Sequence, residues 1–242
     1  MKKHVSFCIP SNAKNKIKIN FCIKSLLDTL SKHAESFSYD IKVCGIDPDL
    51  DLQYSFVPRT REARNGFVSR LRSALFQESI SSYLIVYLDD DIVFPEDWAK
   101  KFDIFIGNDH SYFSNRILNA DNTRYWDRAI GWVEPSGQPS VRMASYDISP
   151  SDKSLYQTSG MFCIKPEVLE KEGWNENLAW NQHEDFDLSK RIIHNLNIPI
   201  HFDYKNFVWH WDRNYTAVAS NVIKGAGVCS ESKELIKRIL EL

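Results

Sequence analysis

The 242-residue sequence has little glycine or proline, nine residues of each, and 43% of it is hydrophobic, which excludes disordered, collagen-like and coiled-coil chains. It also lacks long apolar runs. None approaches the roughly 18 residues that a transmembrane helix needs, and the run at residues 5–10 is too short for the core of a signal peptide. We therefore expect one large domain with a sizeable core, soluble or peripheral at a membrane at most.

The cysteines are too few and too scattered for a metal cage or a disulfide framework. Their number is odd, and no two of them are arranged as Cys-x-x-Cys. A reduced, cytoplasmic environment is the simplest expectation for such cysteines. They are Cys8, Cys22, Cys44, Cys163 and Cys229.

Neither sign of charge is in excess, because 30 Lys and Arg residues face 32 Asp and Glu residues, for a formal net charge of −2. Such a chain has no overall field that would attract nucleic acid or an anionic membrane, so any anion site must be local. The densest basic segment has five arginines between Arg59 and Arg72 and is interrupted by Glu62. We interpret most of these arginines as a solvated helix face. A non-catalytic module that binds nucleic acid or glycans is the alternative.

Apolar segments of strand length alternate with segments of helical periodicity, which is the pattern of βα units on a mostly parallel sheet. This pattern predicts an α/β fold. Residues 108–154 lack it and predict exposed loops, including 135–140, with one or two short strands. The expected strands cover residues 5–9, 41–46, 83–88, 160–165, 198–202 and 207–211. The expected helices cover residues 19–30, 60–77, 95–105, 166–172, 184–196 and 232–242.

Three adjacent aspartates, Asp89, Asp90 and Asp91, follow the most apolar of these strands. Adjacent carboxylates repel one another unless a cation or strong donors neutralise them, and their hard oxygens suit Mg²⁺ or Mn²⁺. Asp89 and Asp91 face the same side of an extended chain, and ligands bind at the carboxyl ends of strands in open α/β sheets. We predict a divalent-metal site here. The alternative is that the aspartates only cap the following helix or loop.

A second acidic cluster lies at residues 183–188, where Glu184 and Asp185 begin a helix. The helix macrodipole by itself explains acidic residues at that position. It does not explain the preceding segment, in which Trp174 and Trp180 stand among several amides, a composition suited to stacking on a sugar and hydrogen-bonding its hydroxyls. One carboxylate of the cluster is a candidate general base.

His210 stands alone in an aromatic strand, between Trp209 and Trp211. A core histidine with satisfied hydrogen bonds is the usual explanation for this pattern. Imidazole is nevertheless a good third ligand beside two carboxylates, particularly for Mn²⁺. His201 is the competing candidate for the same role.

The order of these parts resembles the GT-A glycosyltransferases, in particular the bacterial family 2 type, over nearly the whole chain. The resemblance is carried by VSFCIPS, ARNGF, YLIVYLDDD with its DXD motif, and SGMFCIKPEVLEKEGWNENL to HEDFDLSKRI with its ED motif. It implies a single GT-A domain, with a Rossmann-like, mostly parallel central sheet flanked by helices and a small acceptor-side subdomain. Residues 1–107 would bind the nucleotide sugar. Residues 108–242 would bind the acceptor and carry out catalysis.

The resemblance also assigns roles to residues. Asp91 and His210 would bind the metal. Asp89 and Asp90 would lie near the ribose or the metal. Asp185 would be the catalytic base. The family often has DDGS after its second strand, whereas this chain has GIDPDLD, so the identity of the nucleobase stays open. The donor-binding candidates that remain are Pro10, Ser11, Asp47 and Arg64, and the acceptor-binding candidates are Trp180 and Glu184.

The function that the resemblance implies is a metal-dependent inverting glycosyltransferase, with Mn²⁺ or Mg²⁺ as cofactor. The donor would be a nucleotide sugar, with a UDP-sugar favoured, and the acceptor a hydroxyl of a glycan or glycolipid in surface polysaccharide or lipopolysaccharide assembly at the inner membrane. A nucleotidyltransferase of similar fold is the alternative, although IPSNAKNK lacks the glycine-rich phosphate loop that such an enzyme normally needs. We expect no nucleic-acid partner.

Overall fold

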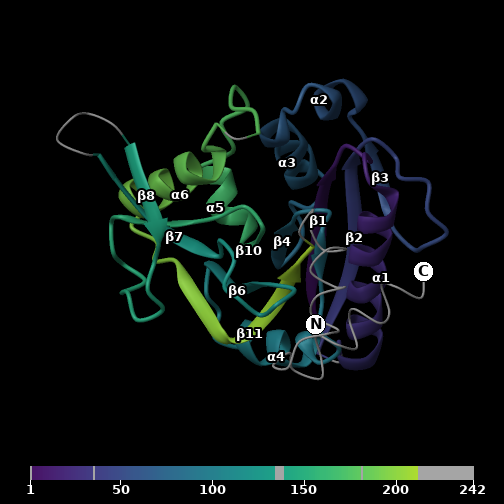
Figure 1. Ribbon diagram of the computed structural model, residues 1–242, viewed down its shortest axis with the longest axis horizontal. Helices are drawn as coiled ribbons and strands as arrows, with labels where there is room; N and C mark the ends of the chain where they lie inside the picture. Colours follow the sequence, from purple (N-terminus) through teal and green to yellow (C-terminus); the bar gives the residue numbers. More distant parts are fainter. Residues whose placement is uncertain (1, 35, 134–138, 181, 212–242) are drawn as a thin grey trace.

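The computed structural model of the protein describes residues 2–34, 36–133, 139–180 and 182–211. Its centre is an eight-stranded sheet in the order β3-β2-β1-β4-β10-β6-β11-β5 (Figure 1). Six of these strands run in one direction, and only β10 and β5 run opposite to them. The strands are β1 (Lys3–Ser11), β2 (Phe37–Gly45), β3 (Ser55–Pro58), β4 (Leu84–Leu88), β5 (Ile92–Val93), β6 (Tyr112–Asn119), β10 (Met161–Ile164) and β11 (His201–His210).

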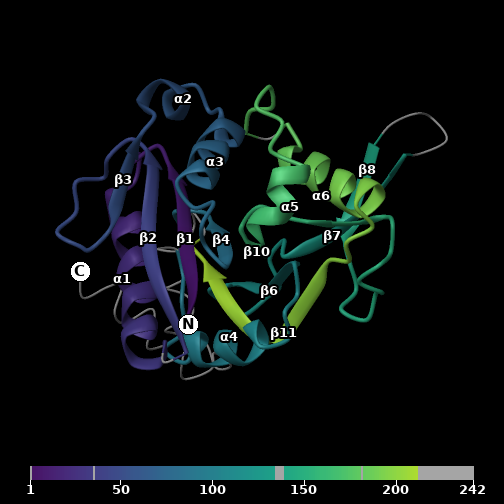
Figure 2. The same ribbon diagram turned by 180° about the vertical axis from the view of Figure 1, so that it is seen from behind.

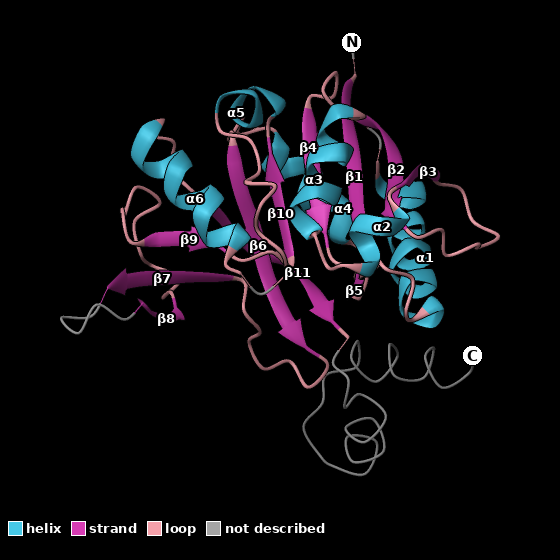
Figure 3. Ribbon diagram, turned by 90° about the horizontal axis from the view of Figure 1, so that it is seen from above, coloured by secondary structure: helices cyan, strands magenta, loops and turns pink. Residues whose placement is uncertain are grey.

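A smaller, three-stranded sheet in the order β8-β7-β9 stands beside the main sheet, and β7 and β8 project away from it (Figures 1 and 2). This sheet consists of β7 (Arg128–Val133), β8 (Pro139–Met143) and β9 (Leu155–Gln157), and β9 packs against α6 (Figure 3). The helices are α1 (Lys16–His33), α2 (Thr60–Arg64), α3 (Val68–Gln77), α4 (Trp98–Ile106), α5 (Pro166–Lys171) and α6 (Glu184–Asn195).

Helices cover both faces of the main sheet. Val5, Phe7 and Ile9 of β1 belong to a buried cluster with residues of α1 and α4, whereas Cys8 belongs to a second cluster with residues of α3, α5 and α6. This division follows from the alternation of side chains along a strand. Because both faces are buried, the central strands are mostly apolar rather than alternating, which is why the sequence pattern reveals them. The α/β fold class is confirmed.

The segments predicted as helices at 60–77 and 95–105 differ in detail from the prediction. The first is broken into α2 and α3, because Gly66 adopts φ +72°, a left-handed conformation that ends α2. The second begins only at Trp98, after a turn in which the Trp98 N–H donates to the carbonyl of Pro95 at 3.1 Å. The remaining expected strands and helices within the described residues are present, with boundaries that shift by a few residues.

The prediction of exposed loops with one or two short strands over residues 108–154 is wrong in its extent of strand. That segment contains β6, β7 and β8, and β6 lies inside the main sheet between β10 and β11. Buried polar residues hid β6 from the sequence pattern, since Ser114 Oγ donates to Gln157 Oε1 at 2.5 Å inside the protein rather than to water. The two strands predicted at 198–202 and 207–211 are one strand, β11, whose register shifts between Asp203 and Phe207.

Some sequence predictions lie outside the described residues, namely the helix at 232–242, most of the loop at 135–140, and Cys229. The four cysteines that the structure describes are buried and form no disulfide, and burial raises the pKa of each thiol. In the described ranges no helix combines the length and the apolar character needed to cross a membrane.

Gly45 allows the carboxyl ends of β1 and β2 to approach closely. Its φ is +128°, and a Cβ atom there would lie 2.1 Å from the Ser11 carbonyl oxygen. We expect Gly45→Ala to lower the free energy of unfolding by about 3 kcal/mol, since it combines backbone strain with this clash. Gly66→Ala, where φ is +72° and nothing lies within 4 Å, should cost only about 1 kcal/mol. Urea unfolding of both variants checks this, and equal losses would show that the Ser11 contact relaxes.

Candidate active site

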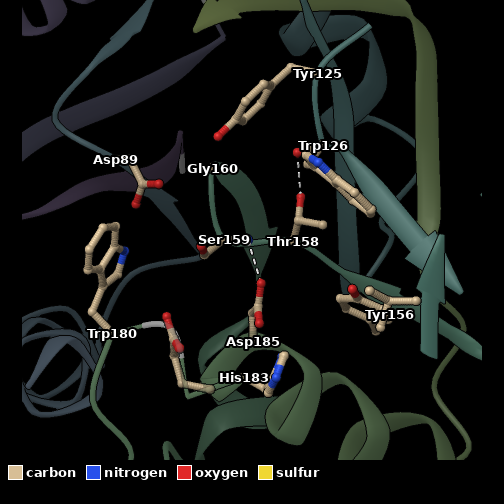
Figure 4. Close-up of a pocket in the computed structure, with 12 residues that line it drawn as sticks. Asp89, Tyr125, Trp126, Tyr156, Thr158, Ser159, Gly160, Trp180, His183 and Asp185 are labelled. Atoms are coloured by element: carbon tan, nitrogen blue, oxygen red, sulfur yellow. Dashed lines mark hydrogen bonds between the residues drawn. The ribbon is translucent and has the colours of Figure 1, made fainter. Parts of the chain in front are cut away.

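A pocket of about 340 Å³ lies where the carboxyl end of β4 faces the start of α6 (Figure 4). Figure 4 shows Asp89 and Trp180 on one side, Trp126 and Tyr156 on the opposite side, and Asp185 between them. The pocket therefore joins both acidic clusters that the sequence singled out. The residues that line it are Asp89, Tyr125, Trp126, Val141, Tyr156, Thr158, Ser159, Gly160, Trp180, His183, Glu184 and Asp185.

The three aspartates after β4 contact three different sets of partners. Arg72 Nη2 donates to Asp89 Oδ1 at 3.3 Å, and Ser11 Oγ at the end of β1 donates to Asp90 Oδ2 at 2.6 Å. Burial raises the pKa of both Asp89 and Asp90, the neighbouring aspartates add to the increase, and Arg72 and Ser11 oppose it. A bound cation would stabilise the ionised form of such a group of carboxylates.

Asp91 is the aspartate that meets the predicted ligand His210. The antiparallel pairing of β11 with β5 places His210 opposite Ile92, and His210 Nε2 lies 3.5 Å from Asp91 Oδ2. Tyr125, which lines the pocket, stacks on the imidazole with ring centroids 3.9 Å apart. A carboxylate and an imidazole that converge in this way fit two positions around Mn²⁺ or Mg²⁺. Among the described residues, no group of three His, Cys, Asp or Glu side chains is arranged to hold a metal ion.

The competing histidine, His201, lies at the other end of β11. Its ring stacks on His110 with centroids 3.6 Å apart, and burial lowers the pKa of both imidazoles. Of the two candidates, the structure brings His210 to Asp91.

Asp185 lies in the first turn of α6 and is held by two backbone N–H groups. The Ser159 N–H donates to its Oδ2 at 3.0 Å, and the Phe186 N–H donates to its Oδ1 at 2.8 Å. Burial raises the pKa of Asp185, while Arg72 and these hydrogen bonds oppose the increase. A fixed carboxylate with a raised pKa suits a general base. The preceding residue, His183, has φ +60° and ψ 38°, which is strained for a side chain of its size.

Arg72 connects the two acidic clusters, and the sequence analysis missed its role. It is only 1% exposed, so the prediction of a solvated helix face is wrong for this arginine. Its Nη1 lies 3.4 Å from Glu184 Oε1, and its guanidinium lies 5.0 Å from the centre of the Trp174 ring. Burial raises the pKa of Glu184, and Arg72 opposes this increase. Arg72 precedes the apolar residues Leu75 and Phe76 of α3 by three and four positions, and this helical spacing was the signal available in the sequence.

Exposed aromatic rings flank the pocket. The sequence singled out Trp180, whose side chain is exposed and whose backbone N–H donates to the carbonyl of Gly66 at 2.8 Å; the residue is 61% exposed. The sequence indicated no specific role for Trp126, which is 41% exposed. The backbone carbonyl of Trp126 accepts from Thr158 Oγ1 at 2.7 Å (Figure 4). Two such rings present the flat apolar surfaces on which a sugar stacks.

Of the six predicted donor-binding residues Asp89 lines the pocket, and the other five, Pro10, Ser11, Asp47, Arg64 and Asp90, do not. Pro10 is buried in β1, opposite Cys44 of β2. Asp47 is exposed after β2, and its Oδ1 accepts from the Tyr54 hydroxyl at 2.8 Å. Arg64 is exposed at the end of α2. Pro10 and Asp47 therefore lie along the edge where β1 and β2 end, beside Ser11.

Comparison with known proteins supports the fold. No family model and no curated protein matches the sequence. Among solved structures, GalNAc-T7 with UDP, GalNAc and Mn²⁺ has a TM-score of 0.62 at 15% identity. The match covers 88% of this chain and 44% of the GalNAc-T7 chain. The mannosyltransferase PcManGT from Pyrobaculum calidifontis, with GDP-Man and Mn²⁺, has a TM-score of 0.56 at 12% identity. The match covers 98% of this chain and 69% of the PcManGT chain. The chain thus spans less than half of GalNAc-T7. These similarities confirm the predicted GT-A fold.

Proposed function

We propose that this protein is a metal-dependent glycosyltransferase of the bacterial family 2 type, which moves a sugar from a nucleotide sugar to a hydroxyl of a glycan or glycolipid. The observation that carries the proposal is the pocket, where Asp89 and Asp185 line one space between exposed tryptophans. The shared fold supports it, because GalNAc-T7 holds UDP and GalNAc, and PcManGT holds GDP-Man. We further propose a UDP-sugar donor and a role in surface polysaccharide or lipopolysaccharide assembly in the cytoplasm, with peripheral association at the inner membrane.

The chain divides by function within one domain. Residues 1–107 would bind the donor, with Ser11 and Asp90 at the nucleoside and Asp89 toward the ribose or the metal. The hydrogen bond from Ser11 to Asp90, which joins the ends of β1 and β4, supports the placement of these two residues at one site. Pro10, Asp47 and Arg64 would complete the donor side. Residues 108–242 would bind the acceptor, with Trp180 and Glu184 in contact with it.

Asp185 would act as the general base. As the acceptor oxygen forms its bond to the anomeric carbon, Asp185 takes the hydroxyl proton, and the bond from that carbon to the diphosphate breaks with its electron pair leaving on the diphosphate. Attack from the face opposite the leaving group inverts the anomeric centre. A divalent cation held by Asp91 and His210, with Asp89 as a further candidate ligand, would supply positive charge for the leaving diphosphate. Arg72 would keep Glu184 beside Asp89.

The proposal is tested by incubating the protein with a panel of nucleotide sugars and Mn²⁺ and following donor hydrolysis. We expect one donor to be consumed slowly without an acceptor, and the NMR signal of the released sugar to show the inverted anomer first. Consumption of nucleoside triphosphates with sugar phosphates would instead indicate the nucleotidyltransferase. Absence of turnover with every nucleotide sugar and every nucleoside triphosphate would indicate the binding module.

We expect Asp91→Asn to weaken Mn²⁺ binding by about 100-fold, because the amide removes the charged oxygen that faces His210. Calorimetric titration with Mn²⁺, alone and with UDP or GDP, measures the loss. Asp97→Asn is the matched control, since Asp97 pairs with Lys101 on the surface and its removal changes the charge equally. An unchanged Mn²⁺ affinity in Asp91→Asn would refute the metal site.

A further inference from the structure

The lysine Lys18 on α1 reaches the carboxylate that the proposed metal would need. Its Nζ donates to Asp91 Oδ2 at 3.2 Å and to the carbonyl of Trp211 at 2.6 Å, and its side chain is only 14% exposed. His210 approaches the same Asp91 oxygen, at 3.5 Å. The ammonium of Lys18 therefore contacts a carboxylate and a backbone carbonyl, and it shares the carboxylate oxygen with an imidazole. Carboxylates, carbonyls and imidazoles are also the groups that ligate divalent cations.

The placement of Lys18 opposes the electrostatics of its own helix. It stands in the first turn of α1, three residues after the N-cap Asn15, whose side chain accepts from the Lys18 N–H. That turn contains no acidic residue. A cation near a helix N-terminus is unfavourable with the macrodipole, so the helix itself offers no reason for a lysine there. The reason that the structure shows is the contact with Asp91.

We propose that Lys18 is a tethered competitor of the divalent cation for Asp91. This inference rests on the proposed function. With no cation bound, the ammonium neutralises Asp91, whose neighbours Asp89 and Asp90 are also acidic. A divalent cation on the same oxygen repels the ammonium, so binding requires Lys18 to leave Asp91. The donor diphosphate offers the displaced ammonium new acceptor oxygens. Lys18 thereby makes metal binding depend on the donor, and the protein without donor holds the metal weakly.

The experiment measures Mn²⁺ affinity without donor, by calorimetry and by the EPR signal of free Mn²⁺. We expect Lys18→Met to bind Mn²⁺ about tenfold more tightly than the wild type, within the range usual for coupling between sites. Lys16→Met is the matched control. It removes the same charge from the same turn of α1, but Lys16 is exposed and pairs with Asp49 at 3.8 Å, so the Mn²⁺ affinity of this variant should stay unchanged.

A second measurement uses the nucleoside diphosphate, UDP or GDP, that the wild type binds more tightly, in the presence of saturating Mn²⁺. Lys18→Met should bind it more weakly, because the displaced ammonium is lost as a partner of the diphosphate. Lys18→Gln, which still carries a donor for the Trp211 carbonyl, repeats both measurements if the methionine variant does not fold.

Unchanged or weaker Mn²⁺ binding in both Lys18 variants would overturn the inference and assign Lys18 a structural role between α1 and β11. The proposed metal site would still stand in that case, provided that Asp91→Asn loses Mn²⁺. If the wild type, Lys18→Met and Asp91→Asn all bind Mn²⁺ equally, the metal site itself is refuted. The proposed competition between Lys18 and the cation for Asp91 is then refuted as well.

Discussion

The Asp185→Asn variant should bind the nucleotide-sugar donor as tightly as the wild type and lose turnover by about 10²–10⁴-fold, the range expected when a general base is removed. The amide oxygen can still accept a backbone hydrogen bond, from Ser159 or Phe186, so the start of α6 keeps its place. It cannot accept the proton of an attacking hydroxyl. Donor affinity by calorimetry and turnover by donor consumption are measured on the same preparation.

The wild-type pH profile belongs to the same prediction. Burial raises the pKa of Asp185 above its ordinary value, so the ionised base is lost as the pH falls, and the rate should decline on the acid side before an unburied aspartate would protonate. Asp187→Asn is the control. Asp187 lies on the same helix, pairs with Arg191 at 2.8 Å and does not line the pocket, so its variant should keep turnover. Loss of donor affinity in Asp185→Asn would place Asp185 in the donor or metal site instead.

Replacement of Arg72 by Met should lower the free energy of unfolding by roughly 3 kcal/mol, because it leaves Glu184 and Asp89 without their cation. We place the effect at the low end for broken buried pairs, since the Asp89 side chain is 37% exposed. In a domain of this size the loss corresponds to about 6–12 °C in Tm. Arg70→Met is the control, because Arg70 is exposed on the same helix and its Nε donates to the carbonyl of Glu176.

The loss should depend on pH in a defined direction. Arg72 lowers the pKa of Glu184 against the effect of burial, so its removal raises that pKa further. A carboxyl whose folded pKa exceeds its unfolded value costs stability as the pH rises past the unfolded pKa. The difference between Arg72→Met and the wild type should therefore be small near pH 4 and full near pH 8. Denaturation at both pH values checks this, and a difference that does not grow with pH would mean that Arg72 acts through packing alone.

Arg72→Lys separates charge from geometry. The lysine keeps the positive charge, but a single ammonium does not reproduce the two directed contacts that the planar guanidinium makes with Asp89 and Glu184. We expect an intermediate loss of stability. Stability equal to that of the wild type would show that charge alone is required between the two acidic clusters.

The sequence was sufficient for the features that depend on local pattern. The strand before Asp89 and the helix after His183 were predicted nearly to the residue, because apolar runs and helical periodicity record burial along one element. The pattern failed in β6, where Ser114 and Asn115 are buried and Ser114 donates to Gln157 of a distant segment. Periodicity is read as apolar or polar, so a buried polar residue is mistaken for a surface one.

The sequence by itself determined that strand ends and a helix start carry acidic clusters, because residue order along one element is enough to place a side chain at its end. Only the tertiary structure decided which partner each carboxylate meets. Asp90 meets Ser11 because β1 pairs in parallel with β4, and Asp91 meets His210 because β11 pairs with β5. Arg72 is buried between clusters that lie far apart in the chain. Such contacts depend on strand order and register, which follow from packing of the whole domain and leave no pattern within a single segment.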